Sequence, residues 1–336
     1  MRDKRVSSKD VAREAGVSQA TVSYVLNNNP NVKIRPETRQ AVIEAARRLN
    51  YHVDYIARNM RLRKSASIAI VNNLAMSSYV SMRALEGIKA SLVERNYSVT
   101  ICFGSYTDIQ DAEFIKYYYS NLVDGIIFVF CDLKQADITF LENHRIPYVT
   151  INANTQPFAR FQIKTDMKPA VSDAAAHLKE KGCGSIGFLG QFAGDEKSMR
   201  FSSYRAAMRE HNMRVQNRFV FHVANNEQTM EEEIAARLNG AKLPHALFCD
   251  NVNAGFHTLR YMQMNNIKVP DEISLVILGT NTFSKRVYPA FTAVEAPLYT
   301  MGYRGSELLF DIMESEYKTH SDAIVLQWQF VARESS

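Results

Sequence analysis

At 336 residues the chain is longer than a single ordinary hydrophobic core supports, so two or three folding units are expected. Its 46% hydrophobic and 22% charged residues are typical of a globular protein and exclude a disordered or fibrous chain. The longest apolar runs are only as long as a strand, and the charged N-terminus is followed by no apolar segment. Neither a membrane span nor a secretory signal is predicted, and we expect a cytoplasmic protein.

The net charge of +5 is distributed unevenly along the chain. Residues 1–64 contain 14 Lys and Arg against 6 Asp and Glu, whereas the remainder contains 26 against 29. Concentrated basic charge indicates a polyanion-binding segment, although such a segment can also be merely solvated. The four cysteines stand singly, without the spacing of metal ligands or disulfides, so buried free thiols are expected, with no metal and no cofactor.

Residues 7–26 show the pattern of two short helices joined by a tight turn. Ser8 is expected to cap the first helix and Ser18 the second, and Gly16 supplies the left-handed turn between them. A third helix is expected from Pro36 to about Leu49. Their apolar faces would form one core from Val11, Ala12, Ala15, Val17, Ala20, Val22, Val25, Leu26, Val42, Ala45, Ala46 and Leu49. Such a helix-turn-helix offers its second helix to the major groove of DNA.

The stretch from Ser8 to Asn27, SKDVAREAGVSQATVSYVLN, resembles the headpiece of the lactose/galactose-repressor family. That family's hallmark is D-V-A-x-x-A-G-V-S-x-x-T-V-S-x-V-L-N, and the continuation from Arg35 to Tyr51 matches as well. The resemblance implies a sequence-specific transcriptional regulator, typically a repressor, that binds a double-stranded DNA operator as a homodimer.

The resemblance also implies which residues contact DNA. The base-reading positions are Gln19, Ala20 and Tyr24; glutamine suits adenine and alanine a thymine methyl. Tyr24 replaces the arginine common in the family, so a guanine contact is not expected there. The short hydroxyl residues resemble the family's phosphate contacts, although Thr21 and Ser23 can instead simply face solvent. The complete implied set is Ser7, Ser18, Gln19, Ala20, Thr21, Ser23, Tyr24, Asn27, Arg58 and Met60.

Residues 54–64 are basic, have helix-forming composition and contain no Gly or Pro. A free helix of this length is marginal, but this segment resembles the family's hinge helix, which pairs with its twin on DNA. Met60 takes the place of the leucine that wedges into the minor groove, and Arg58 precedes it. An ordinary basic linker is the alternative.

From Ser67 onward, strand-like runs alternate with amphipathic helices in two similar sets. This pattern predicts an α/β core of two doubly wound parallel-sheet lobes, and the family resemblance makes it periplasmic-binding-protein-like. The expected strands are 67–71, 98–103, 125–130, 148–151, 185–189, 219–223, 246–249 and 274–278, with helices at 80–95, 168–181, 201–211 and 253–265. The expected organisation is a headpiece at 1–53, a hinge at 54–64 and a core at 65–333, with lobe 1 about 65–162 and 297–323 and lobe 2 about 165–292 and 324–333.

Ligands of such sheets bind outside the carboxyl ends of the strands, between the lobes. By family position the effector-binding residues are Asn73, Ser77, Phe128 (or Phe130), Asn152, Arg200, Asn251 and Asn281. Asparagines stand where the family commonly has aspartates that accept hydrogen bonds from sugar hydroxyls. With Arg200, Lys285 and Arg286 nearby, a sugar phosphate or another polar anion is one hypothesis and a neutral sugar the other. The two loop residues Lys285 and Arg286 can also point to solvent.

An enzyme is the rival interpretation, because doubly wound sheets host many catalysts. Gly182–Gly187 spells G-x-G-x-x-G, but these glycines are expected to follow a helix and lead into a strand, which is the wrong context for a dinucleotide site. No other catalytic pattern is found, and a free sugar-binding protein would not need the headpiece. The sequence therefore predicts a regulator and no enzyme. Whether its effector induces or corepresses is open; dimerisation is expected through the face of 80–95 and its equivalents on the second lobe.

Overall fold

The computed structural model describes residues 6–26, 32–51, 65–73, 78–104, 106–151, 159–226, 228–315 and 323–336. The chain divides into two compact units, residues 1–65 and 66–336. The predicted hinge helix at 54–64 lies outside the described residues, as do Asn27, Arg58, Met60, Ser77 and Asn152. Within the described ranges, none of the helices has both the length and the apolar character needed to cross a bilayer.

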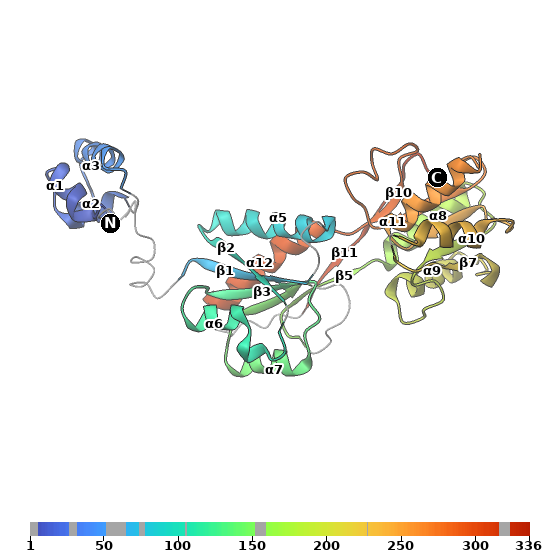
Figure 1. Cartoon of the computed structure of the whole chain (residues 1–336), viewed down its shortest axis with the longest axis horizontal. Helices are drawn as coiled ribbons and strands as arrows, with labels where there is room; N and C mark the ends of the chain where they lie inside the picture. Colours follow the sequence, from blue (N-terminus) through green and yellow to red (C-terminus); the bar gives the residue numbers. More distant parts are fainter. Residues whose placement is uncertain are drawn as a thin grey trace. The chain divides into compact units, whose positions relative to one another are not determined.

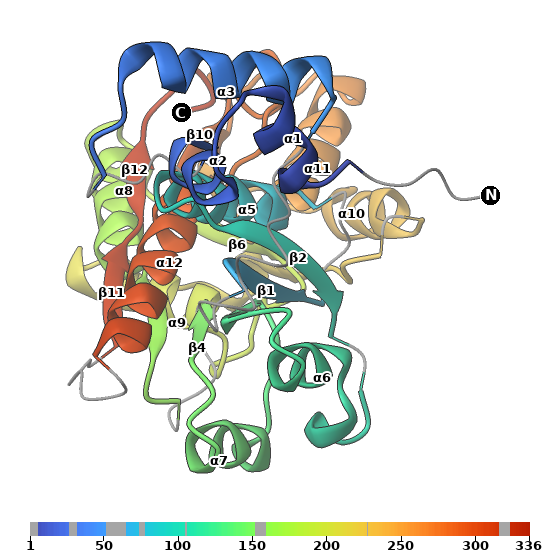
Figure 2. The ribbon, with the colours of Figure 1, turned by 90° about the vertical axis from the view of Figure 1, so that its left-hand side faces the viewer.

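The first unit is a bundle of three helices, drawn in blue in Figures 1 and 2: α1 (Ser8–Glu14), α2 (Gln19–Leu26) and α3 (Pro36–Arg48). They enclose a small core whose most buried members are Val11, Val22, Val25, Val42 and Ala45. The core follows from the helical period, because Val22 and Val25 share the inward face of α2. The predicted helix-turn-helix is confirmed.

The local turn chemistry of this unit is also largely as expected. Gly16 has φ +65°, and Ser18 caps α2 because its Oγ accepts the Thr21 N–H at 3.1 Å. Two expectations were wrong. Ser7 rather than Ser8 precedes α1, and its N–H donates to Asp10 Oδ2 at 3.0 Å. Ala20 is exposed, because it lies on the face of α2 opposite the buried valines.

The second unit begins with a six-stranded parallel sheet in the order β11-β5-β4-β3-β1-β2. Its strands are β1 (Ser67–Asn72), β2 (Ser98–Phe103), β3 (Gly125–Val129), β4 (Tyr148–Ile151), β5 (Gln162–Asp166) and β11 (Ile324–Gln327). One face is covered by α5 (Tyr79–Glu94) and α12 (Leu298–Glu314), the other by α6 (Glu113–Tyr119) and α7 (Gln135–Asn143), with the short η1 (Ile109–Asp111) before α6 (Figures 1 and 2). Because helices cover both faces, the central strands β1, β3 and β4 are buried along their whole length.

A second six-stranded sheet has the order β12-β10-β9-β8-β6-β7. Its strands are β6 (Ile186–Gly190), β7 (Val220–His222), β8 (Ala246–Cys249), β9 (Ser274–Leu278), β10 (Thr292–Glu295) and β12 (Gln329–Val331). Two apolar clusters pack on it, one formed with α8 (Lys168–Glu180) and α9 (Met199–Glu210), the other with α10 (Met230–Leu238) and α11 (Val252–Met264); η2 (Asn217–Phe219) precedes β7. The two-lobed α/β fold is confirmed, except that β12 runs antiparallel to β10.

The lobe boundaries differ from the expected ones at the crossings between the sheets. β10 extends the second sheet to Glu295, and β5 keeps the first sheet as far as Asp166. β11 pairs with β5 in the first sheet, so the chain returns to the second sheet at Trp328 and not at 324. The sequence did not predict this crossing because β11 is an edge strand with alternating half-buried and exposed residues. Such a pattern fits either sheet equally well.

Helices α5 and α12 approach each other so closely that their glycines cannot carry a side chain. A Cβ at Gly302 would lie 1.9 Å from the carbonyl oxygen of Ala84, and one at Gly87 would lie 2.0 Å from that of Tyr299. Because these obstacles are backbone atoms, Gly302→Ala must push the helices apart.

We expect Gly302→Ala to lower the free energy of unfolding by about 1–3 kcal/mol, measured by urea denaturation. Thr300→Ala, at an exposed position of the same helix, is the control and should change it by less than about 0.5 kcal/mol. Equal losses in both variants would show that the close helix contact contributes nothing.

Candidate DNA interface and effector site

The outward face of α2 carries the three residues expected to read bases. Gln19 and Ala20 are its first two residues and are exposed, and Tyr24 is 39% exposed on the same helix. The N-terminal residues of a recognition helix are those that reach base edges in the major groove. Gln19 also has a partner that the sequence did not predict, since its Nε2 donates to Ser8 Oγ at 2.7 Å. The structure therefore leaves the expected readers accessible.

The hydroxyl residues expected to contact phosphates already have partners in the headpiece. Ser7 Oγ donates to Asp10 Oδ2 at 2.7 Å, and the hydroxyls of Ser18 and Thr21 are hydrogen-bonded at 2.9 Å. Thr21 and Ser23 are half-buried, so neither is simply a solvated side chain. The exposed cations of the described headpiece are Lys9, Arg13, Lys33, Arg35, Arg47 and Arg48. These contacts fix the helix ends, and DNA contact by the hydroxyls stays a prediction.

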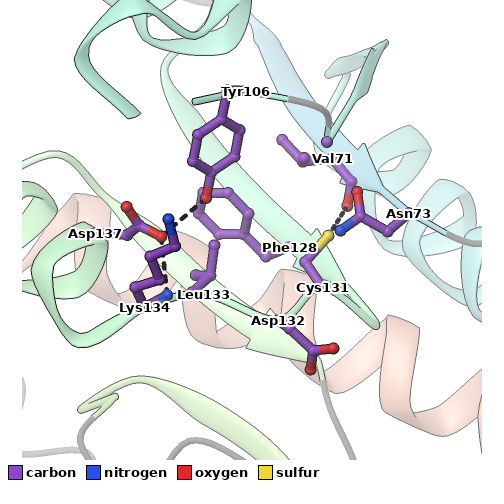
Figure 3. A pocket seen from close by; sticks show the side chains of 10 residues that line it. Val71, Asn73, Tyr106, Phe128, Cys131, Asp132, Leu133, Lys134 and Asp137 are labelled. Carbon is purple, nitrogen blue, oxygen red and sulfur yellow. Dashed lines mark hydrogen bonds between the residues drawn. The ribbon is translucent and has the colours of Figure 1, made fainter. Parts of the chain in front are cut away.

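A cavity of about 90 Å³ lies where β1, β2 and β3 end in the first lobe (Figure 3). It is at the carboxyl ends of the strands, the edge where ligands of such sheets bind. Two of the sequence-predicted residues, Asn73 and Phe128, line it. The other lining residues are Val71, Gly104, Tyr106, Cys131, Asp132, Leu133, Lys134 and Asp137. A pocket enclosing a whole ligand measures roughly 300–1,000 Å³, so this cavity can hold only part of one.

The polar groups of the cavity centre on the buried carboxylate of Asp137. The Tyr106 hydroxyl donates to its Oδ2 at 3.1 Å and the Lys134 N–H at 2.8 Å, as Figure 3 shows. Burial and the Asp137 charge raise the pKa of Tyr106, so its phenol remains a proton donor. Cys131 Sγ donates to the Val71 carbonyl at 3.2 Å, and burial raises its pKa to about 12. Cys131 is therefore a thiol and not a nucleophilic thiolate.

Asn73 reaches the cavity because its neighbour, the residue directly after β2, is a glycine. A Cβ at Gly104 would lie 1.8 Å from Asn73 Oδ1, so the amide occupies the space that a side chain there would need. Phe128 is 1% exposed and packs edge-on against Phe114 at 5.4 Å between ring centroids. It forms an apolar wall of the cavity while belonging mainly to the core; the alternative, Phe130, is half-buried.

In the second lobe Arg200 joins the ends of two strands. Its Nη1 donates to the carbonyl oxygens of Asp250, after β8, and of Leu278 at 3.3 Å, at the end of β9. Burial lowers the pKa of Arg200, and the charge of Asp250 opposes this effect. Asn251 Oδ1 accepts the Ala254 N–H at 2.9 Å and so caps α11. Both side chains stabilise the edge of the sheet where a ligand is expected.

The loop after β9 is held in a similar way. Asn281 Oδ1 accepts the N–H groups of Phe283 and Ser284, both at 2.9 Å, which is an Asx turn. Lys285 Nζ lies 3.5 Å from Glu295 Oε2, so part of the basic charge expected near the effector is paired. Effector contact by Arg200, Asn251 and Asn281 stays a prediction, and each of them has a structural role.

Asp250 is the most deeply buried carboxylate of this edge, with no exposed surface. Its Oδ2 accepts the Phe192 N–H at 3.0 Å, and its Oδ1 accepts Asn251 Nδ2 at 2.6 Å. A Cβ at Gly190 would lie 2.0 Å from its carboxyl carbon, so the glycine makes room for it. Burial raises the pKa of Asp250 despite these donors and the nearby Arg200.

Comparisons with known proteins agree with both units. Residues 8–54 match the family of bacterial regulatory proteins called lacI, and residues 175–336 match the periplasmic binding protein-like domain. The chain is 26% identical over 312 residues to catabolite control protein A of Staphylococcus epidermidis, covering 93% of each protein. The chain therefore combines a lacI-family DNA-binding domain with a periplasmic binding protein-like domain. It is therefore a DNA-binding transcriptional regulator.

Solved structures of lacI-family regulators share the fold of this chain. The lac repressor dimer bound to operator and the anti-inducer ONPF superposes with a TM-score of 0.77 at 18% identity, covering 99% of each chain. The transcriptional regulator CelR in complex with cellobiose gives 0.66 at 23% identity, covering 99% of this chain and 100% of that one.

Several residues of these sites could not be found by sequence reasoning. Tyr106 and Asp137 meet across 31 residues of sequence, which no local pattern indicates. In the sequence, Asp250 is only an acidic residue that follows a strand and precedes Asn251. Its burial depends on Gly190 in the neighbouring strand, which sequence spacing does not indicate. For Ser8, the available signal is a polar residue in the first turn of α1, which a capping role explains without any contact to α2.

Proposed function

We propose that this chain represses transcription from an operator that it binds as a homodimer, and that a small polar ligand of the core controls operator affinity. The observation that carries the proposal is the exposed row of Gln19, Ala20 and Tyr24 on the second helix of a helix-turn-helix. The core adds a cavity at the carboxyl ends of parallel strands. A regulator of this kind acts in the cytoplasm, where its operator is, and we assign it no catalytic step.

Selection of bound duplexes from a random pool tests DNA recognition. The full-length protein should enrich one pseudo-palindromic sequence, and its affinity should fall by orders of magnitude as salt rises. Tyr24→Ala should alter the enriched bases without unfolding the headpiece, because Tyr24 does not belong to the buried core. Binding that is insensitive to salt or to sequence would overturn the proposal.

The charges around the cavity favour a neutral, hydroxyl-rich ligand over an anion. Among the described residues that line the cavity, two carry carboxylates, Asp132 and Asp137, and one carries an ammonium, Lys134. In the second lobe Arg200 is engaged by backbone carbonyls, and Lys285 pairs with Glu295. Carboxylates and carbonyls accept hydrogen bonds from hydroxyls but repel a phosphate. The cellobiose complex of CelR supports a sugar.

A thermal-shift screen of neutral sugars against their phosphates identifies the ligand class, because a ligand of the folded state raises the melting temperature. Trp328, the single tryptophan, lies where the chain passes from β11 to β12, and its backbone N–H donates to the Asp166 carbonyl at 3.0 Å. Its fluorescence should therefore respond when a ligand changes the arrangement of the lobes. Stabilisation by phosphates alone would reverse the assignment.

Gly104→Ala is expected to weaken binding of that ligand roughly 2- to 10-fold, the net value of one hydrogen bond. The new methyl group would occupy the place of Asn73 Oδ1 and turn the amide out of the cavity. Since the displaced atom ends a flexible side chain, stability should hardly change. Calorimetric titration measures the affinity. Gly184→Ala is the control, because its Cβ would lie an ordinary 3.6 Å from the ring of His245; equal affinities in both variants would exclude Asn73 from the site.

Ligand and operator binding should be linked through the hinge that joins headpiece and core. Linkage is reciprocal, so the ligand must change operator affinity by the factor by which operator changes ligand affinity. Measuring operator affinity with and without ligand gives the sign: weaker binding identifies an inducer, and stronger binding a corepressor.

A further inference from the structure

We propose that Ser8 determines base specificity by positioning Gln19. By accepting one of the two N–H bonds of the Gln19 amide, Ser8 makes that amide select adenine and reject guanine. The inference rests on the proposed function, since it requires α2 to enter the major groove. It assigns to Ser8 a role that acts through another residue and needs no contact of its own with a base.

The hydrogen bond from Gln19 Nε2 to Ser8 Oγ, 2.7 Å long, connects the first residues of two different helices. Both ends of the bond are fixed. Val11 on α1 and Val22 on α2 are at most 1% exposed in the shared core, which holds the helices together. Asp10 holds the start of α1 by accepting the N–H and the hydroxyl of Ser7 at 3.0 and 2.7 Å. The Ser8 hydroxyl is thus held in place beside the first residue of α2.

The chemistry of the amide decides what this bond does. A glutamine side chain has one carbonyl oxygen and two N–H donors. Adenine presents an N6 donor and an N7 acceptor in the major groove, whereas guanine presents two acceptors, O6 and N7. With one N–H given to Ser8, Gln19 retains one donor and one acceptor, which is the complement of adenine. An amide released from Ser8 can rotate and direct both N–H groups at guanine.

The test begins with selection of bound duplexes from a random pool by the full-length wild type and by Gln19→Ala. The base pair whose preference disappears in Gln19→Ala is the one that Gln19 reads. Competition binding then measures the preference for each base at that position. At that position Ser8→Ala should reduce the preference for adenine over guanine by roughly 2- to 10-fold, the net value of one hydrogen bond. Ser8→Thr keeps the hydroxyl and should restore the wild-type preference. Melting curves and the preferences at all other positions should remain those of the wild type, which a purely structural role of Ser8 would not produce.

Each other outcome overturns the inference. An unchanged adenine preference in Ser8→Ala would show that the bond does not orient Gln19. A uniform loss of affinity for every sequence would make Ser8 a phosphate contact. If Gln19→Ala selects the same sequences as the wild type, Gln19 does not read a base. If the wild-type protein itself enriches no sequence, the proposed function fails, and this result is distinguishable from the other three.

Discussion

Replacing Asp250 with alanine is expected to lower the free energy of unfolding of the core by about 3–5 kcal/mol, the loss typical of breaking a buried charged network. The carboxylate is fully buried and accepts hydrogen bonds from Phe192 N and Asn251 Nδ2. Its removal leaves these donors without an acceptor and Arg200 without the nearby negative charge. In a thermal melt the expected decrease in Tm is on the order of 10 °C. Because the same network holds the ends of β8 and β9, ligand binding should fall as well.

Two variants separate this network from other effects. Asp250→Asn keeps the shape of the side chain, but an amide N–H group can then face the donor Asn251 Nδ2. The free energy of unfolding should therefore fall by about 1–3 kcal/mol. Burial raises the pKa of Asp250, so the folded state holds this proton more tightly than the unfolded chain, and ionisation of the group costs stability as pH rises. The asparagine variant should lack that contribution. Asp271→Ala, at an exposed position, should leave the melt unchanged; a comparable loss there would refute the assignment to burial.

Much of the fold could be predicted because most elements are locally consistent. The expected strands 98–103, 148–151, 246–249 and 274–278 have the bounds of β2, β4, β8 and β9. They are short apolar runs between turn residues, which the pattern rules identify directly. The crossing at β11 could not be predicted, because its partner β5 is about 160 residues away and its half-exposed residues fit either sheet.

The position of some candidate effector residues could be predicted, but their contacts could not. Asn73 and Asn281 follow β1 and β9, and Phe128 lies near the end of β3, whereas Arg200 belongs to α9. Effector contact by these four residues stays a prediction. What each side chain does depends on neighbours that sequence spacing cannot reveal. Arg200 binds backbone carbonyls because β8 and β9 end beside it, and the cavity's main acid is Asp137, contributed by α7.

Edge strand β2 packs beside α5, the helix whose face is expected to form the dimer, and carries an exposed apolar row that extends this predicted interface. Val99, Ile101 and Phe103 alternate onto one face and are 37%, 46% and 71% exposed. An exposed apolar patch of this kind marks a surface that another chain covers. An edge strand also has unpaired backbone groups that can pair with a second strand. Phe103→Asp should therefore convert the proposed dimer to monomers, observed by sedimentation velocity. Operator affinity should fall by about 10²- to 10⁴-fold, because two linked headpieces bind adjacent half-sites far more tightly than one.

The same kind of substitution at another exposed apolar residue shows whether the loss of the dimer depends on the position or only on the added charge. Leu122, 56% exposed just after α6, lies away from β2 in sequence, and Leu122→Asp should leave both the dimer and operator affinity unchanged. If Phe103→Asp still sediments as a dimer, β2 does not form the interface. If instead it is monomeric yet binds operator as tightly as the wild type, the dimer contributes nothing to recognition, and the two-headpiece arrangement must be abandoned. A monomer with reduced operator affinity and a normal melting curve is the expected result, and it would show that the interface at β2 supports DNA binding by holding two headpieces together.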